Sequence, residues 1–235
     1  MRVLIGFDPR EEAAAEVARK SLCEVTNDEI EPEFLCMAKL EAHGLLRRPV
    51  DQRGPQDYDL VSNAPQSTRF AISRFLTPIL CQQGYALFVD CDVVFLRDPR
   101  AMLLEVEAKH AVSVVKHGAM QGIGTVLPTY KMVNQRQQAY SRKWWSSVML
   151  FNCDHPANRR LSLRDVNERP GRDLHAFYWL HDDEIGALSS YWNWLVDVQA
   201  RPAKLGIAHM TLGGPWIDGW AGGSFDEEWK AASRG

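Results

Sequence analysis

Two aspartates at the end of an apolar segment are the residues whose types and spacing point most directly to chemistry. The segment Ala86–Pro99 reads Ala-Leu-Phe-Val-Asp-Cys-Asp-Val-Val-Phe-Leu-Arg-Asp-Pro, and its first four residues have the composition of a buried strand. Asp90 and Asp92 follow that strand, and residues two apart in extended backbone point the same way. A carboxylate buried without a partner is costly, and a divalent cation removes that cost. The pair predicts a Mn²⁺ or Mg²⁺ site, with two acids that merely cap a strand as the alternative.

Two further candidate site residues lie at other predicted strand ends. Arg2–Gly6 reads as a strand that runs into Phe7 and Asp8, and Leu205–Ala208 reads as a strand that ends at His209. Ligands of parallel α/β sheets bind beyond the carboxyl ends of the strands. Two carboxylates and one imidazole suit Mn²⁺ with open positions for phosphate oxygens, whereas a lone histidine at a strand end can also be purely structural.

The elements that must position these residues alternate between strands and helices. Glu11–Leu22 reads as a helix with acids in its first turn, and Glu33–Met37 reads as a second strand. This opening predicts an α/β fold with a central, mostly parallel sheet flanked by helices. Further strands are expected at 111–115, 147–152 and 192–196, and further helices at 68–83, 174–180 and from 225 onward.

Three segments are predicted to depart from this regular pattern. Arg47–Ala64 has no periodicity and is expected to be a surface loop. Pro78 is expected to kink or end the helix at 68–83. Met120–Arg142 is polar, rich in Gln and long for an unstructured connection, which predicts a lid.

Composition restricts the class of protein. The 235 residues, 46% hydrophobic and 24% charged, fit one domain that spans residues 1–235. A net charge of −3 argues against a nucleic-acid partner bound through bulk charge. Bases outnumber acids between Pro128 and His175, which indicates either a solvated face or an anion-handling region. No apolar run approaches the roughly 20 residues of a membrane span.

Cysteine usage and the start of the chain bear on the compartment. The five cysteines are scattered and form no Cys-x-x-Cys pair, so neither a zinc framework nor a disulfide framework is expected. The sequence starts directly with a predicted strand and not with a basic and then apolar leader. We therefore expect a cytoplasmic protein.

Several motifs occur together in a fixed order. They are Ile5-Gly6-Phe7-Asp8, Ser73-Arg74-Phe75, the Asp-x-Asp, Val148–Asn152, the acidic cluster before Trp192-Asn193, and His209 followed by Gly-Pro-Trp. In this order the chain resembles the nucleotide-sugar glycosyltransferases of the GT-A fold. It is nearest to family 8, the group of glycogenin and the lipopolysaccharide galactosyltransferases. The resemblance runs from the first strand to about Trp216.

The resemblance implies three sets of site residues. The metal ligands would be Asp90, Asp92 and His209. The donor-binding residues would be Phe7, Asp8, Arg74, Asp90, Gly213 and Gly214, the two glycines letting backbone approach a diphosphate. The catalytic residues that border the transferred sugar would be Asp182 and Asp183.

The activity implied is that of a metal-dependent glycosyltransferase. It would move a sugar from a nucleotide-sugar donor, a UDP-hexose, to a carbohydrate or other hydroxyl acceptor with retention of configuration, using Mn²⁺ or Mg²⁺. Residues 1–118 would form the nucleotide and metal half, and residues 119–235 the sugar and acceptor half.

The chain departs from the family pattern at three places, which are Trp145-Ser146-Ser147, Asp183 and Gly214. The last replaces a phosphate-binding lysine, so Lys131, Arg142 and Lys143 become candidates for neutralising the diphosphate. Two other readings stay open. One is a haloacid-dehalogenase-type Mg²⁺-dependent phosphatase, whose strand also ends in Asp-x-Asp. The other is a catalytically silent protein that binds a sugar nucleotide.

Overall fold

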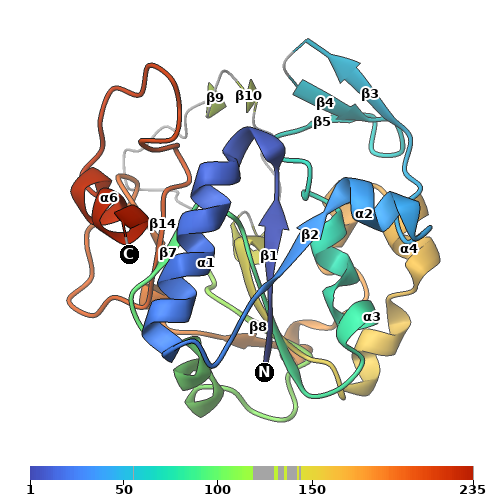
Figure 1. Cartoon of the computed structure of the whole chain (residues 1–235). Coiled ribbons are helices and arrows are strands. Elements are labelled where there is room, and N and C mark those ends of the chain that lie inside the picture. Colours follow the sequence, from blue (N-terminus) through green and yellow to red (C-terminus); the bar gives the residue numbers. More distant parts are fainter. Residues whose placement is uncertain (55, 119–129, 132–134, 137–141, 143, 235) are drawn as a thin grey trace.

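A mostly parallel sheet forms the centre of the molecule (Figure 1). The computed structural model describes residues 1–54, 56–118, 130–131, 135–136, 142 and 144–234. Among these, six strands pair in the order β12-β8-β11-β6-β1-β2, with only β11 antiparallel to its neighbours. The strands are β1 (Arg2–Phe7), β2 (Glu33–Cys36), β6 (Tyr85–Val89), β8 (Val112–Val114), β11 (Val148–Asn152) and β12 (Ile185–Ala187). The predicted α/β fold class is confirmed.

A small three-stranded sheet stands beside the carboxyl end of β6. It consists of β7 (Val93–Phe95), β14 (Ile207–His209) and β13 (Trp194–Leu195), with β14 in the middle. β7 follows β6 after only three residues, and it pairs antiparallel with β14. This sheet therefore connects the Asp-x-Asp segment to a strand more than a hundred residues later in the chain.

The prediction of a loop at residues 47–64 is wrong. An antiparallel sheet of β3 (Val50–Arg53), β4 (Gln56–Asp59) and β5 (Ala64–Gln66) occupies this segment, and Figure 1 shows it beyond the carboxyl end of β1. The buried residues of β4 are Asp57 and Asp59, which form ion pairs with Arg69 and Arg48. An alternation whose buried members are acids gives no hydrophobic signal, so the sequence pattern does not reveal these strands.

Helices cover both faces of the central sheet. They are α1 (Glu12–Thr26), α2 (Met37–Ala42), α3 (Thr77–Cys81), α4 (Leu163–Glu168), α5 (Gly171–His175) and α6 (Asp226–Arg234). The connections β1–β2 and β2–β6 run in opposite directions across the sheet, so right-handed crossovers place α1 and α3 on opposite faces. Within the described part of the chain, no helix is long and apolar enough to cross a membrane.

The predicted helix at 68–83 is much shorter than expected. A 3-10 turn at Ser73–Leu76 leads into α3, and Pro78 lies in the first turn of that helix. The first turn is where the missing N–H of proline costs no hydrogen bond. Pro78 therefore helps to begin a helix and does not kink or end one.

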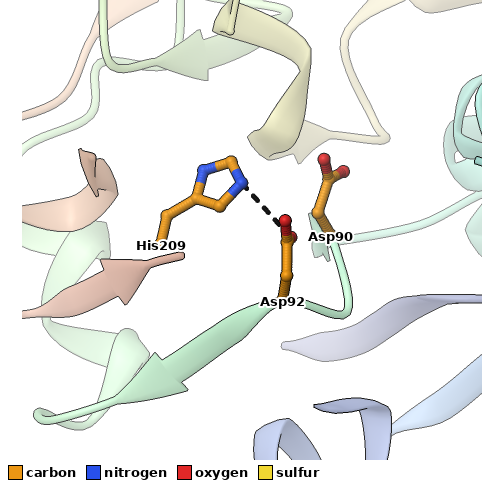
Figure 2. A group of neighbouring side chains, drawn as sticks. All are labelled: Asp90, Asp92 and His209. Atoms are coloured by element: carbon orange, nitrogen blue, oxygen red, sulfur yellow. Dashed lines mark ion pairs between the residues drawn. The ribbon is translucent and has the colours of Figure 1, made fainter. Parts of the chain in front are cut away.

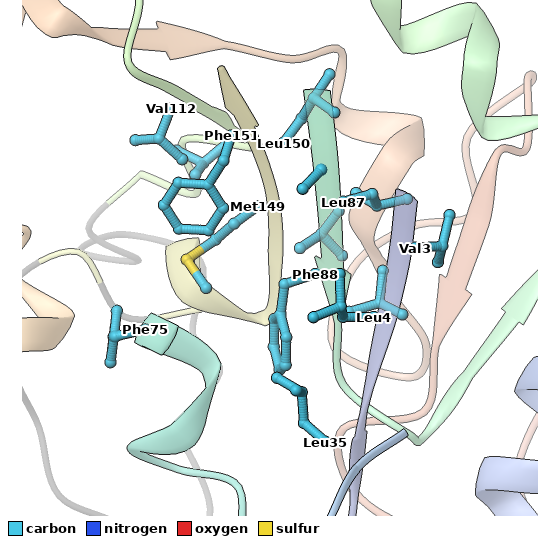
Figure 3. Close-up of a cluster of buried hydrophobic side chains, with 14 of the residues drawn as sticks. Val3, Leu4, Leu35, Phe75, Leu87, Phe88, Val112, Met149, Leu150 and Phe151 are labelled. Atoms are coloured by element: carbon cyan, nitrogen blue, oxygen red, sulfur yellow. The ribbon is translucent and has the colours of Figure 1, made fainter. Parts of the chain in front are cut away.

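The core lies between the central strands and the segments on either face. Val3, Leu4, Leu87, Phe88 and Phe151 are all buried, and Figure 3 shows them packed along β1, β6 and β11. Strands buried on both faces are expected to read as continuous apolar runs, which is why these were recognisable in the sequence. This rigid centre fixes where the strand ends deliver their polar residues.

Candidate metal and nucleotide-sugar site

Asp90, Asp92 and His209 come together at the carboxyl end of β6 (Figure 2). Each is buried, and one ligand atom from each lies within 4.8 Å of the other two. Asp90 follows β6, Asp92 precedes β7 and His209 ends β14. The structure thus joins the three residues that the sequence suggested as metal ligands.

Strand pairing explains the positions of two of these residues. His209 lies opposite Val93 in the register of β14 and β7, next to Asp92 in the chain. The amide of Met210 donates to the carbonyl oxygen of Asp92 at 2.8 Å. The amide of Asp90 in turn donates to the carbonyl oxygen of Ser147 at 2.9 Å, just before β11. Backbone hydrogen bonds on both sides therefore hold the Asp-x-Asp segment.

Cys91, between the two aspartates, belongs to the opposite face. Its Sγ donates to Oε2 of buried Glu11 at 3.6 Å, which fits the alternation of side chains in extended backbone. Burial, reinforced by the surrounding acids, raises the pKa of Cys91 well above its ordinary value. The thiol stays neutral and adds no charge to the site.

A hydrogen-bond chain sets the orientation of the His209 ring. Nδ2 of Asn193 donates to Oγ of Ser147 at 2.9 Å and to the carbonyl oxygen of Trp144 at 3.3 Å, so Oδ1 of Asn193 is the atom that faces His209. Oδ1 lies 2.9 Å from Nδ1 of His209, which must therefore carry a proton. In the neutral ring Nε2 then presents its lone pair, 3.2 Å from Oδ1 of Asp92. Two acceptors that face each other at this distance need a proton or a metal ion between them, and two carboxylates with one imidazole fit a metal ion.

Arg74 belongs to the same site, where it pairs with Asp90. Its Nη1 lies 2.8 Å from Oδ1 of Asp90 and donates to the carbonyl oxygen of Ser146 at 2.8 Å. The guanidinium is buried near Phe70 and Phe88, with ring centroids 5.2 and 5.1 Å away. Arg74 thus holds Asp90 in place, and its predicted contact with the donor stays a prediction.

Among the described residues, the formal charges of this group do not balance when the His209 ring is neutral. Asp90 and Asp92 supply two carboxylates, and Arg74 supplies one guanidinium. A divalent cation would change the net charge of the group from −1 to +1. A group of that charge favours an anionic ligand such as a diphosphate.

Neutral polar groups extend the site toward α5. Nδ1 of His175 lies 2.7 Å from Oγ of Ser146, the residue whose carbonyl binds Arg74. Burial, and then the charge of Arg74, lowers the pKa of His175 to about 3. His175 is therefore neutral at physiological pH. The sequence offered no signal for it, because it lies in an aromatic segment that reads as core.

His117 is a second buried histidine near His209 that sequence reasoning left without a role. It follows β8, and its Nδ1 lies 3.2 Å from Nε2 of Gln199. Burial, and then interaction with His209, lowers the pKa of His117 to about 4. The ring also meets Trp144 edge to face, with centroids 6.1 Å apart.

Asp8 does not join the metal-ligand group. Its carboxylate accepts from Nε and Nη2 of Arg10, at 2.9 and 2.6 Å, and from the amide of Arg69 at 2.9 Å. Burial by itself raises the pKa of Asp8, but the hydrogen bonds and charge of Arg10 outweigh it and hold the pKa below the ordinary value. Phe7, at the same strand end, packs against Phe34 with ring centroids 5.5 Å apart. Their contact with a nucleoside stays a prediction.

Asp182 and Asp183 lie in a short 3-10 turn just before β12. β12 runs parallel to β8 and therefore to β6. Asp182 pairs with Arg142, and Asp183 is exposed. Their predicted role beside the transferred sugar stays a prediction.

The two glycines after β14 have structural reasons of their own. Gly213 has a φ of 116°, which other residues rarely adopt. A Cβ on Gly214 would lie 2.1 Å from the ring of Trp216, whose Nε1 donates to Oε1 of Glu11 at 3.3 Å. The space left at Gly214 is therefore filled by Trp216, and close approach to a diphosphate stays a prediction.

The predicted lid at 120–142 falls mainly outside the described residues, as does Lys143. Lys131 belongs to β9 (Tyr130–Lys131), which pairs with β10 (Gln135–Arg136). Arg142 is described, and it donates to the carbonyl oxygen of Ala176 at 2.5 Å. Its guanidinium also pairs with Asp182, and its role in neutralising a diphosphate stays a prediction.

Comparison with known sequences shows the family to which the chain belongs. Protein CDI of Arabidopsis thaliana is 37% identical over 234 residues, which cover 97% of this chain and 84% of that protein. No protein-family model matches the chain.

Solved structures identify the fold. The galactosyltransferase LgtC, in complex with donor and acceptor sugar analogues, superposes with a TM-score of 0.57 over 100% of this chain and 95% of LgtC, at 16% identity. The glycosyltransferase GlyE of Streptococcus pneumoniae TIGR4 gives a TM-score of 0.55 over 99% of this chain, at 14% identity. The chain spans about 60% of the length of GlyE. These similarities show the GT-A glycosyltransferase fold that the sequence motifs predicted.

Proposed function

Because the chain belongs to the family of Protein CDI and has the GT-A glycosyltransferase fold, we propose that it is a metal-dependent glycosyltransferase. It transfers a hexose from a UDP-sugar to a hydroxyl group of an acceptor. The bond from the sugar C1 to the diphosphate breaks, a bond from C1 to the acceptor oxygen forms, and the acceptor proton is released. Retention of configuration and a cytoplasmic location are part of the proposal.

The observation that carries this proposal is the buried group of Asp90, Asp92 and His209. Its two carboxylates and one imidazole nitrogen suit Mn²⁺, and the nitrogen makes Mg²⁺ the weaker candidate. When bound, such an ion supplies Lewis-acid stabilisation of the charge that develops on the leaving diphosphate. The tautomer that Asn193 imposes on His209 supports this reading, because it leaves Nε2 free to bind a cation.

The residues around this group have complementary tasks. Arg74 holds Asp90 and limits the negative charge that the diphosphate must approach. Ser146 and His175 add neutral hydrogen-bonding groups. The Asp8 end of the sheet would receive the nucleoside, as the family resemblance implies. The burial of the metal-ligand group strengthens each electrostatic interaction in it.

Asp182 and Asp183 stay in the proposal as the acids that would border the transferred sugar, as the family resemblance implies. The haloacid-dehalogenase alternative does not fit the GT-A fold. A silent sugar-nucleotide-binding protein has the same fold and the same site, so experiment must separate it from an enzyme.

Calorimetry with UDP tests the proposal directly. Wild type should bind UDP in the presence of MnCl₂ and bind it far more weakly after chelation with EDTA. Asp92→Asn should abolish the Mn²⁺-dependent part, whereas Asp98→Asn, which removes an acid outside the site, should not. Equal affinity for UDP with Mn²⁺ and with EDTA would contradict the proposal. Binding without any turnover of UDP-glucose or UDP-galactose would favour the silent protein.

A further inference from the structure

Two buried histidines near the metal-ligand group are held in opposite tautomers. Nδ1 of His209 faces an amide oxygen, that of Asn193, so Nδ1 carries the proton and Nε2 has the lone pair. Nδ1 of His117 instead faces an amide nitrogen, that of Gln199 at 3.2 Å. An amide nitrogen donates, so Nδ1 of His117 accepts and the proton of the neutral ring lies on Nε2.

The orientation of the Gln199 amide is fixed by a second contact. The backbone amide of Leu195 donates to Oε1 of Gln199 at 3.3 Å. Backbone amides only donate, so this oxygen is correctly placed, and the nitrogen is the atom that points to His117. Leu195 is also the residue of β13 that pairs with His209. One strand therefore helps to position both imidazoles.

The proton on Nε2 of His117 meets no acceptor among the described residues. This nitrogen is fully buried and has no hydrogen-bond partner among the described residues. A buried donor without an acceptor costs more than an ordinary hydrogen bond contributes, so such donors usually have a ligand or water as partner. Because the ring is neutral, this donor suits a neutral oxygen better than a charged phosphate, for which a cation would serve.

The order of the strands indicates which part of a donor would reach His117. Along the carboxyl edge, β1 with Asp8 comes first, then β6 with the metal-ligand group, then β11, and then β8 with His117. Neighbouring strands are about 4.8 Å apart, so His117 lies on the side of the metal-ligand group away from Asp8. A donor whose nucleoside lies near Asp8 and whose diphosphate lies near Asp90 would direct its sugar toward β8.

We propose that Nε2–H of His117 donates a hydrogen bond to a hydroxyl oxygen of the sugar that is transferred. The inference rests on the proposed function, and it adds a specificity residue for the donor sugar. Gln199 is a positioning residue, because it sets the tautomer of His117 without facing the ligand.

Two variants and two ligands test the assignment. His117→Phe keeps a flat ring beside Trp144 and removes the donor, whereas His117→Gln keeps an N–H. Affinities for UDP, UDP-glucose and UDP-galactose are measured by calorimetry with MnCl₂. His117→Phe should bind UDP as wild type does and bind the preferred UDP-sugar about tenfold more weakly, the size of one lost hydrogen bond. His117→Gln should recover part of that loss. His43→Phe, at an exposed histidine that follows α2, should change neither affinity.

Each other outcome has a defined meaning. Equal weakening for UDP and UDP-sugars would place the contact on the diphosphate and overturn the assignment. Unchanged donor affinities with a raised KM for the acceptor would place it on the acceptor and also overturn it. A wild type whose UDP-sugar affinities equal that for UDP would overturn it too. Failure of wild type to bind UDP with Mn²⁺ would instead reject the proposed function itself.

The tautomers can be tested without any ligand. Long-range proton–nitrogen NMR spectra identify which ring nitrogen carries the proton. We expect Nε2–H for His117 in wild type, and a loss of that preference in Gln199→Met. A proton on Nδ1 of His117 in wild type would overturn the inference whatever the binding data show.

Discussion

Two acidic groups lie at the carboxyl ends of neighbouring strands, and they differ in how many arginines they contain. At the end of β1, Asp8 and Asp57 meet Arg10 and Arg69, so two negative charges face two positive charges. At the end of β6, one arginine of the described residues, Arg74, pairs with the two aspartates. Asp8 and Asp90 read alike in the sequence, as acids after an apolar strand. The count of guanidinium groups within reach is what separates a self-contained ion-pair network from a site that needs a cation.

The largest expected effect is the loss of turnover in Asp92→Asn, at the end of β6. Asp92→Asn removes a ligand charge and should lower turnover by about 10³-fold, because one charge pair at ~4 Å and an effective dielectric constant of about 20 contributes roughly 4 kcal/mol. Without metal the variant should fold as well as wild type, since it also relieves repulsion between two carboxylates. Steady-state kinetics with MnCl₂ and thermal unfolding in EDTA measure the two effects. A variant that unfolds in EDTA would make Asp92 structural.

The second-largest effect is expected at Asn193, which orients the His209 ring. Asn193→Ala removes the oxygen that keeps the proton on Nδ1, so the ring can turn or adopt the other tautomer. We expect Mn²⁺ affinity to fall by about 10- to 100-fold, as is usual when the partner of a ligating histidine is lost. Titration of Mn²⁺ by calorimetry measures this fall. If Mn²⁺ affinity stays at the wild-type value, the tautomer does not govern the site.

The sequence alone predicted some of the strands and site residues at these two strand ends. β1, β6 and β14 were recognisable as apolar runs, and the alternation of side chains predicted that Asp90 and Asp92 would face one point. The meeting of these acids with His209 needed the family resemblance, because β14 lies more than a hundred residues away. Asp8 and Asp90 were both predicted as site residues because both follow an apolar strand. The neighbouring sequence does not show which arginines each aspartate will contact.

The features that the sequence did not predict depend on pairing between residues far apart in the chain. The strands β3–β5 were missed because the buried residues of β4 are acids, which pair with Arg69 and Arg48. β12 was missed because it has only three residues and its place is set by its partner β8. Asn193 and Gln199 are amides whose partners lie 16 and 82 residues away, so no spacing rule identifies them.

At the end of β1, an Asp-to-Asn substitution should lower the stability of the protein and leave its Mn²⁺ affinity almost unchanged. Asp8→Asn leaves Arg10 and the amide of Arg69 without their carboxylate, and should lower the free energy of unfolding at pH 7. The expected loss is about 1–2 kcal/mol, below that for a fully buried pair because Arg10 is partly exposed. Mn²⁺ affinity should stay within about twofold of wild type. Urea unfolding and Mn²⁺ calorimetry on the same samples measure both, and a large fall in Mn²⁺ affinity would show that the two groups are one site.

The smallest expected effect is the pH dependence of that stability difference. The pKa of Asp8 in the folded protein lies below its ordinary value of 3.8, with burial opposing and Arg10 producing the shift. A carboxyl with a lowered folded pKa binds fewer protons in the folded state, so its contribution to stability is fully present above the unfolded pKa. That contribution disappears as the pH falls through the folded pKa. The difference in unfolding free energy between wild type and Asp8→Asn should therefore be constant from pH 7 to about pH 5 and shrink below about pH 4. Urea titrations across this range measure it, and a difference that grows toward low pH would mean that Asp8 is not the stabilised carboxylate that its arginine contacts indicate.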